Sequence, residues 1–181
     1  DDIAGDTTVE ASENANVRAV GSATVIASGR ANVRAFGNVT IRAIDRATVT
    51  AFDNVTVTAG GDVTVEAAGP VTVTASESAT VIAGGSVTVE AYDDAKVTAS
   101  GDVEVKAYGN VTVIASDRTT VTACGNVTIT ASGDVTVTVP KWASIKRENV
   151  ILLDNSTLKN CHLKTICQSG NWKMESVESA K

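Results

Sequence analysis

The chain alternates apolar and polar residues over most of its length, in units of eight residues. When residues 7–142 are written in rows of eight, 17 rows follow one another without an insertion or a deletion. The third place of every row is Val or Ile, and the fifth place is Ala in every row except the last, which has Val139. The second place is Thr in 13 rows. Such strict self-similarity at a short period predicts a solenoid.

Each row predicts one short strand followed by one corner. Places one, three and five are mostly apolar, whereas places two and four hold Thr or charged residues, and this period-two alternation is typical of a half-buried strand. Places six to eight carry turn residues, such as Ser-Gly-Asp at 132–134 and Tyr-Gly-Asn at 108–110. The fold class expected from the pattern is therefore all-β, a β-solenoid.

One row cannot close a coil, so a coil holds either two or three rows. Two rows give a flat, 16-residue coil with two sheets, and three rows give a triangular, 24-residue coil. A glycine series that recurs in every third row, from Gly37 to Gly133, favours the triangle. The size of the inward residues favours the flat coil, because a triangular interior needs Leu, Ile or Phe, while two sheets meet tightly through Val and Ala. We favour the flat coil of two rows and keep the triangular coil of three rows as the alternative.

Bulky corner residues also favour the 16-residue coil. In that register Phe36 and Phe52 would stack in adjacent coils. Tyr92 and Tyr108 would do the same, and Glu90 would lie beside Lys106, a pair of opposite charge.

The repeat resembles that of several bacterial and phage proteins. Residues 23–27, Ala-Thr-Val-Ile-Ala, and residues 47–54, Ala-Thr-Val-Thr-Ala-Phe-Asp-Asn, carry this octapeptide likeness. Bacterial ice-nucleation repeats are similar in their 16-residue period and outward Thr, but they lack the Val-rich strand of this chain. The resemblance implies a β-solenoid architecture and no particular chemistry.

Composition and charge exclude several classes of partner. The net charge of −6 and the isoelectric point near 4.8 disfavour nucleic acid and anionic lipid. No apolar run is long enough to span a bilayer, so no membrane insertion is expected. Only 3% of residues are aromatic, and the core must therefore be built from small side chains.

The pattern stops near residue 142, and residues 143–181 have a different composition. This segment holds the only leucines of the chain. We expect a small β-rich cap or interaction element with a strand at 149–153 and a hairpin at 164–176. At the other end, residues 1–6 form a short lead-in to the repeat.

Residues suited to catalysis or metal binding are few. His162 is the only His and adjoins Cys161, but adjacent residues on a strand point to opposite faces, so they make no nucleophile pair. Two Cys and one His do not supply four zinc ligands. Cys161 and Cys167 form either a disulfide or two buried thiols, and Asp at the corners is explained by local turns. We expect no enzymatic activity, no cofactor, no metal and no small-molecule substrate.

Outward Thr pairs carry a second functional hypothesis, because flat Thr arrays at strand spacing can order water and bind ice. Outward Thr is also the ordinary choice for a solvated strand. In the 16-residue coil one face collects four pairs, interrupted by Glu90, Glu104 and Lys106. The candidate ice-binding residues are Thr56, Thr58, Thr72, Thr74, Thr120, Thr122, Thr136 and Thr138.

The first functional hypothesis is a rigid rod that joins copies of itself head to tail. Residues 1–140 hold 8 basic and 17 acidic residues, net −9, while residues 141–181 hold 7 basic and 4 acidic, net +3. With only the lead-in before the first row, we expect a nearly bare first coil that faces the basic segment of the next molecule. Such a rod suits an extracellular, cell-surface or particle-associated filament or fibre. Aromatic and Arg-rich interface centres predict Trp142, Lys146, Arg147 and Trp172 at the junction.

Overall fold

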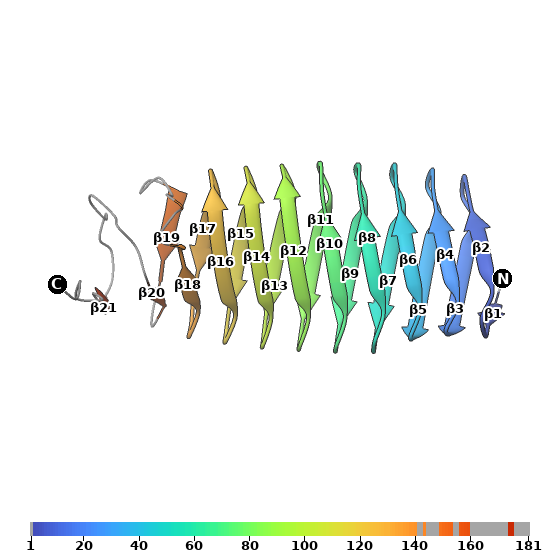
Figure 1. The fold of residues 1–181 in the computed structure, drawn as a ribbon, viewed down its shortest axis with the longest axis horizontal. Helices are drawn as coiled ribbons and strands as arrows, with labels where there is room; N and C mark the ends of the chain where they lie inside the picture. The colour runs from blue at the N-terminus through green and yellow to red at the C-terminus, as the bar shows by residue number, and fades with distance from the viewer. Residues whose placement is uncertain (1, 141–142, 144–148, 154–155, 160–173, 176–181) are drawn as a thin grey trace.

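The protein is a rod of stacked two-stranded coils. The computed structural model describes residues 2–140, 143, 149–153, 156–159 and 174–175, and in these residues the chain winds through two parallel sheets from one end of the rod to the other (Figure 1). Odd-numbered strands up to β19 form one sheet, called sheet A, and the even-numbered strands with β21 form the other, called sheet B. The expected β-solenoid is confirmed.

The strands are short and regularly spaced along the chain. Sheet A contains β1 (Asp2–Ala4), β3 (Asn16–Gly21), β5 (Asn32–Gly37), β7 (Thr48–Phe52), β9 (Thr64–Ala68), β11 (Thr80–Gly84), β13 (Lys96–Ser100), β15 (Thr112–Ser116), β17 (Thr128–Ala131) and β19 (Val150–Leu152). Sheet B contains β2 (Thr8–Ala11), β4 (Thr24–Ala27), β6 (Thr40–Ala43), β8 (Thr56–Ala59), β10 (Thr72–Ala75), β12 (Thr88–Asp93), β14 (Glu104–Gly109), β16 (Thr120–Gly125), β18 (Thr136–Thr138), β20 (Thr157–Lys159) and β21 (Met174–Glu175).

The strand register shows that each coil consists of two rows. Val73 of β10 pairs with Val89 of β12, and Val97 of β13 pairs with Val113 of β15, each in parallel and in register. The flat, 16-residue coil is therefore confirmed and the 24-residue triangle is wrong. The physical reason is the size of the inward side chains, because Val and Ala fill the space between two closely spaced sheets and would leave a triangular interior empty.

The core is a double layer of Val and Ala along the rod. Inward residues at places one, three and five are buried from Val17 onward, and Val89 at mid-rod is 0% exposed. Leu152 of β19 and Leu158 of β20 continue this layer at the C-terminal end. Hydrophobic burial, which contributes about 25 cal/mol per Å² of apolar surface, is thus distributed evenly over the coils rather than concentrated in one centre.

The corners share one backbone feature that the expected turn residues did not specify. From Gly5 to Gly133, one residue in every eight has a positive φ, and no other described residue has one. Gly occupies most of these places because it enters the left-handed region without steric cost. Asp and Glu also occur there, and Asp is one of the residues that tolerate this conformation. The acidic ones are Glu13, Asp45, Asp53, Glu77, Asp93 and Asp117.

Identical or complementary side chains stack between adjacent coils, as the 16-residue register predicts. The rings of Phe36 and Phe52 have centroids 5.1 Å apart, and those of Tyr92 and Tyr108 lie 5.2 Å apart. Both stacks are confirmed.

An amide ladder follows one corner toward the C-terminal end. Asn110 Nδ2 donates to Asp94 Oδ1 over 3.1 Å, Asn126 donates to Asn110 over 3.3 Å, and Asn149 donates to Asn126 over 3.1 Å. These bonds link each coil to the next outside the sheets and satisfy polar groups at the corner.

The C-terminal strands extend both sheets. Ile129 pairs with Val150 and Val137 with Leu158, so the coil at this point is five residues longer than those before it. Leu158 then pairs with Met174, which restores the 16-residue spacing. The strand expected at 149–153 is confirmed as β19, whereas most of the hairpin expected at 164–176 lies outside the described residues.

Candidate functional surfaces

The outward side chains of sheet B form two rows along the rod. Place two is Thr in six successive coils, from Thr8 of β2 to Thr88 of β12, and Glu104 of β14 ends the run. The eight Thr residues predicted for ice binding all lie outward on this sheet, on β8, β10, β16 and β18. Their division into two groups by β12 and β14 is as predicted.

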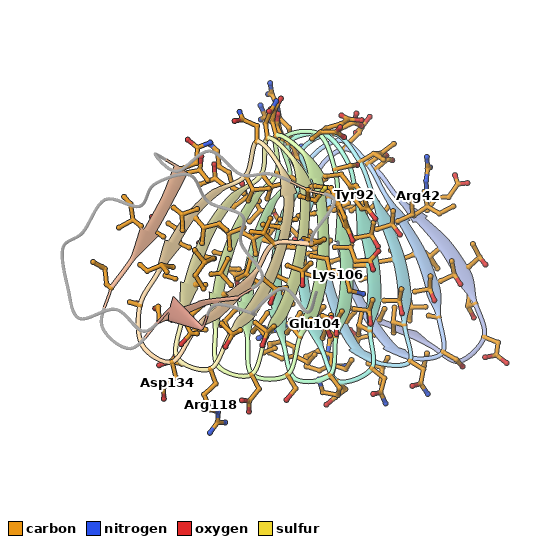
Figure 2. The ribbon with its side chains drawn as sticks, turned by 60° about the vertical axis from the view of Figure 1, so that its left-hand side comes forward. Arg42, Tyr92, Glu104, Lys106, Arg118 and Asp134 are labelled. Atoms are coloured by element: carbon orange, nitrogen blue, oxygen red, sulfur yellow. The ribbon has the colours of Figure 1, made fainter. Side chains whose placement is uncertain are left out.

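A charged cluster on β12 and β14 makes this interruption. Lys106 Nζ lies 3.2 Å from Glu90 Oε1 and 3.9 Å from Glu104 Oε1, and Tyr92 Oη donates to Glu90 Oε2 over 3.3 Å (Figure 2). The hydrogen bond to Glu90 and the charges of both carboxylates raise the pKa of Lys106 above its ordinary value. Partial burial and the nearby Glu90 carboxylate raise the pKa of Tyr92. Lys106 therefore lies between two carboxylates, and the cluster links β12 to β14 across the outward face of sheet B.

The outward face of sheet A is divided along the rod. Toward the N-terminal end it carries Arg18 on β3 and Arg34 on β5, beside the stacked rings of Phe36 and Phe52. Toward the C-terminal end it carries exposed isoleucines at place four or its equivalent. These are Ile82, Ile114 and Ile151, which are 46%, 52% and 53% exposed.

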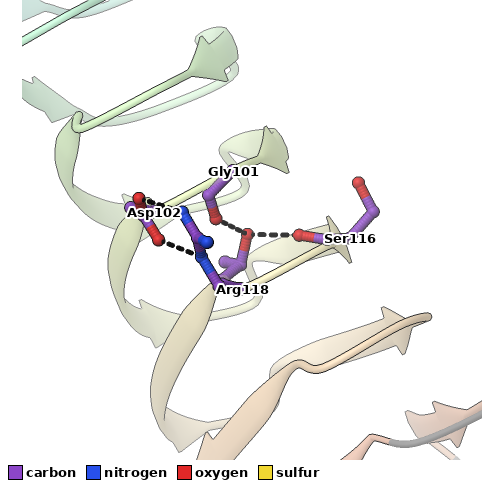
Figure 3. Close-up of polar contacts among 5 residues, drawn as sticks. Gly101, Asp102, Ser116 and Arg118 are labelled. Atoms are coloured by element: carbon purple, nitrogen blue, oxygen red, sulfur yellow. Dashed lines mark hydrogen bonds and ion pairs between the residues drawn. The ribbon is translucent and has the colours of Figure 1, made fainter.

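A third feature lies at a corner, where Arg118 bridges to the preceding coil. Its guanidinium makes two contacts of 2.6 Å with the carboxylate of Asp102 (Figure 3). The bidentate hydrogen bond to Arg118 lowers the pKa of Asp102 below its ordinary value. Beside it the buried hydroxyl of Thr119 donates to a backbone carbonyl, with contacts of 2.7 Å to Ser116 O and 3.3 Å to Gly101 O. These contacts join the coil that contains Arg118 and Thr119 to the preceding coil, which contains Gly101 and Asp102.

The described residues contain no group of three or more His, Cys, Asp or Glu side chains placed to hold a metal ion. Cys124 is a free thiol at a corner, next to Tyr108 in the register of β14 and β16. His162, Cys161 and Cys167 lie outside the described residues.

In the part of the chain that the structure covers, no helix is long and apolar enough to cross a membrane. The expected absence of enzymatic activity and of cofactors stays a prediction.

The four residues predicted for the end-to-end junction, Trp142, Lys146, Arg147 and Trp172, also lie outside the described residues. Arg18 and Arg34, which gather with Phe36 and Phe52 on the outward face of sheet A, were not among the functional residues predicted from the sequence. The signal was present in the sequence, because Arg34 and Phe36 occupy places four and six of one row, Arg18 lies 16 residues before Arg34, and Phe52 lies 16 residues after Phe36.

Comparisons with protein-family models, with curated proteins and with solved structures find no match to this chain.

Proposed function

We propose that the protein is a non-enzymatic rigid rod whose copies join end to end into a filament. The observation that carries this proposal is the uniform stacking of the coils. Each coil meets the next through the same parallel, in-register pairing and the same inward Val and Ala. A coil edge is therefore complementary to any other coil edge, including that of a second copy.

The edge of β2 supplies the hydrogen-bonding groups for such a contact. Thr24 N–H donates to Thr7 O and Ser28 N–H donates to Ala11 O, both over 2.8 Å. Because the groups of successive residues in a strand point to opposite sides, the N–H and C=O of Thr8 and Glu10 face away from β4. In the described chain β2 is the outermost strand at its end of sheet B.

Charge supports a head-to-tail arrangement over a head-to-head one. Residues 1–140 carry a net charge of −9 and residues 141–181 carry +3, so a contact between the C-terminal segment of one copy and the rod of the next joins unlike charges, whereas two C-terminal segments repel each other. The junction then contains Trp142, Lys146, Arg147 and Trp172 on the basic side. A filament of this kind suits an extracellular, cell-surface or particle-associated setting.

A proline on the free edge tests this proposal. Glu10→Pro removes an N–H that faces away from β4, and proline is tolerated at such edge positions. We expect the parent to sediment as a concentration-dependent series of oligomers and Glu10→Pro to stay monomeric with an unchanged circular dichroism spectrum. Glu10→Ala, which removes the charge and keeps the N–H, is the matched control and should associate like the parent. Equal association of the proline and alanine variants would contradict the edge contact.

A second candidate function is ice binding by sheet B. The specific observation in its favour is the unbroken Thr row from β2 to β12 on a regular parallel sheet. Against it, among the described residues of sheet B the outward Thr-x-Thr pairs lie side by side only on β8 with β10 and on β16 with β18. The measurement that decides is thermal hysteresis of the parent protein.

A further inference from the structure

Two arginines lie side by side on the outward face of sheet A. Arg18 of β3 and Arg34 of β5 are register partners, and both are exposed. Like charges placed directly opposite one another on neighbouring strands destabilise a sheet. The next residue in this row is Thr50, a neutral residue that fits a solvated strand. An arginine pair where Thr fits indicates a role for the charges other than folding.

Two stacked phenylalanines orient the guanidinium groups. The Cζ atom of Arg18 lies 5.5 Å from the ring centroid of Phe36, and Cζ of Arg34 lies 5.9 Å from the centroids of both Phe36 and Phe52. The rings themselves stack at an interplanar angle of 12°. Contact between a planar guanidinium and a ring restrains its orientation and leaves N–H donors accessible. The ring contacts therefore restrain both guanidinium groups in the absence of a ligand, with N–H donors accessible to an anion.

The arginines line a shallow groove of about 500 Å³ on sheet A. Asn16 and Asn32 form a second row beside them, and Thr48 and Thr50 continue the two rows on the next coil. Successive coils place one further side chain in each row about every 4.8 Å along the rod. Guanidinium groups bind carboxylates in pairs of hydrogen bonds, while amides and hydroxyls bind alcohol groups.

The charges in the groove leave one guanidinium without a carboxylate partner. Asp2 Oδ2 lies 3.7 Å from Arg18 Nη1. No carboxylate of the described residues lies within ion-pair distance of Arg34. Glu66 lies further along the same row, on β9. A ligand that fits this pattern carries isolated negative charges between neutral, hydroxylated units.

We propose that the groove binds an acidic glycan with one carboxylate per disaccharide, lying along the rod axis with a carboxylate on Arg34. The neutral sugars on either side hydrogen-bond to Asn32, Thr48 and Thr50. Each coil contributes one polar side chain to each of the two rows, so successive sugars along the rod contact the side chains of successive coils.

Two other chain molecules fit the groove less well. An extended peptide binds a sheet by adding a strand at its edge, but the groove lies on a face, where the strands on both sides already pair. Nucleic acid carries a charge on every nucleotide, which is a denser charge than the single unpaired guanidinium of the groove can match beside Glu66.

Calorimetric titration with a hyaluronan hexasaccharide tests the proposal. We expect the parent to bind and Arg34→Thr to weaken binding at least tenfold. Arg42→Thr is the matched control, because Arg42 is exposed at the same place of its row but lies on sheet B (Figure 2); it should bind like the parent. Absence of binding by the parent, or an equal loss in Arg42→Thr, would overturn the proposal.

Stability and competing ligands separate this role from a structural one. Arg34→Thr should melt close to the temperature of the parent, because relief of the like-charge pair offsets the loss of the contacts with Phe36 and Phe52. If Arg34→Thr melts lower, Arg34→Gln supplies the same test, and loss of fold in both variants would contradict the proposal. A neutral chitin hexasaccharide, poly-glutamate and single-stranded DNA should each bind at least tenfold more weakly than the hyaluronan probe. Equal affinity for any of them would overturn the assignment to an acidic glycan.

Discussion

Gly61 lies directly against the backbone of Asp45 in the preceding coil. A Cβ atom added to Gly61 would stand 3.0 Å from the carbonyl oxygen of Asp45 and 3.1 Å from its nitrogen, and φ at Gly61 is +86°. The neighbouring Gly60 differs in both respects, because its φ is not positive and its added Cβ would be 3.5 Å from the nearest atom, a side-chain oxygen. Two adjacent glycines therefore have different structural roles.

Gly61→Ala should destabilise the rod by about 1–3 kcal/mol, because it places a Cβ against backbone in a left-handed conformation. Gly60→Ala should change stability by less than about 0.5 kcal/mol or raise it slightly, since alanine restricts the unfolded chain. Chemical denaturation of both variants measures the difference. Equal effects would mean that the corners relax freely around a side chain.

Val89→Asp should abolish the fold at mid-rod. Val89 is 0% exposed and packs in register with Val73 and Val105, so the variant buries an unpaired charge between the sheets at a cost of about 5 kcal/mol or more. Thr88→Asp, one residue earlier and facing outward, is the control and should remain folded. Thermal melting followed by circular dichroism distinguishes them. A Val89→Asp variant that melts like the parent would contradict the core assignment.

The octad pattern predicted the strands, the coil size and the side-chain stacks, because parallel in-register stacking repeats every contact at a fixed sequence distance. Phe36 with Phe52 and Glu90 with Lys106 are direct consequences of that register. The left-handed conformation at the seventh place of each row was less evident. Gly at this place indicates a positive φ, but several rows have Asp or Glu there, which do not by themselves indicate one.

The C-terminal strands were harder to place from sequence. Five extra residues between rows displace the register after residue 142, so Ile129 meets Val150 instead of residue 145.

The groove on sheet A was missed for another reason. Arg18 and Arg34 are recognisable as outward residues, but their convergence with the rings depends on side-chain directions across two coils, which row patterns do not encode.

The Asp102–Arg118 pair predicts a defined acid dependence. Arg118 holds the pKa of Asp102 below its ordinary value of 3.8, so the pair stabilises the folded state above that pH and loses its effect as pH falls through the lowered pKa. Arg118→Gln should be less stable than the parent at pH 7 and indistinguishable from it below the lowered pKa. Both side chains are largely exposed, and the difference should shrink in high salt.

The control for this pair is Arg46→Gln, because Arg46 makes one longer contact, 3.8 Å, with Asp62. Urea denaturation of all three proteins across pH checks the expectation. A difference for Arg118→Gln that persists unchanged into strong acid would contradict a role for the ion pair.

The ice-binding proposal predicts that activity depends on the Thr pairs of sheet B. Thr72→Tyr and Thr122→Tyr should lower thermal hysteresis and leave the melting temperature nearly unchanged, because both side chains face outward. Thr98→Tyr, on sheet A, should have no effect on hysteresis. A parent protein that neither depresses the freezing point nor shapes ice crystals would remove this function.

End-to-end association is tested most directly by electron microscopy of the parent protein over a range of concentrations. The filament proposal predicts threads one rod wide that lengthen with protein concentration, shorten in high salt, and disappear in Glu10→Pro while persisting in Glu10→Ala. Separate single rods at the highest concentration, with light scattering that reports a monomer, would contradict it.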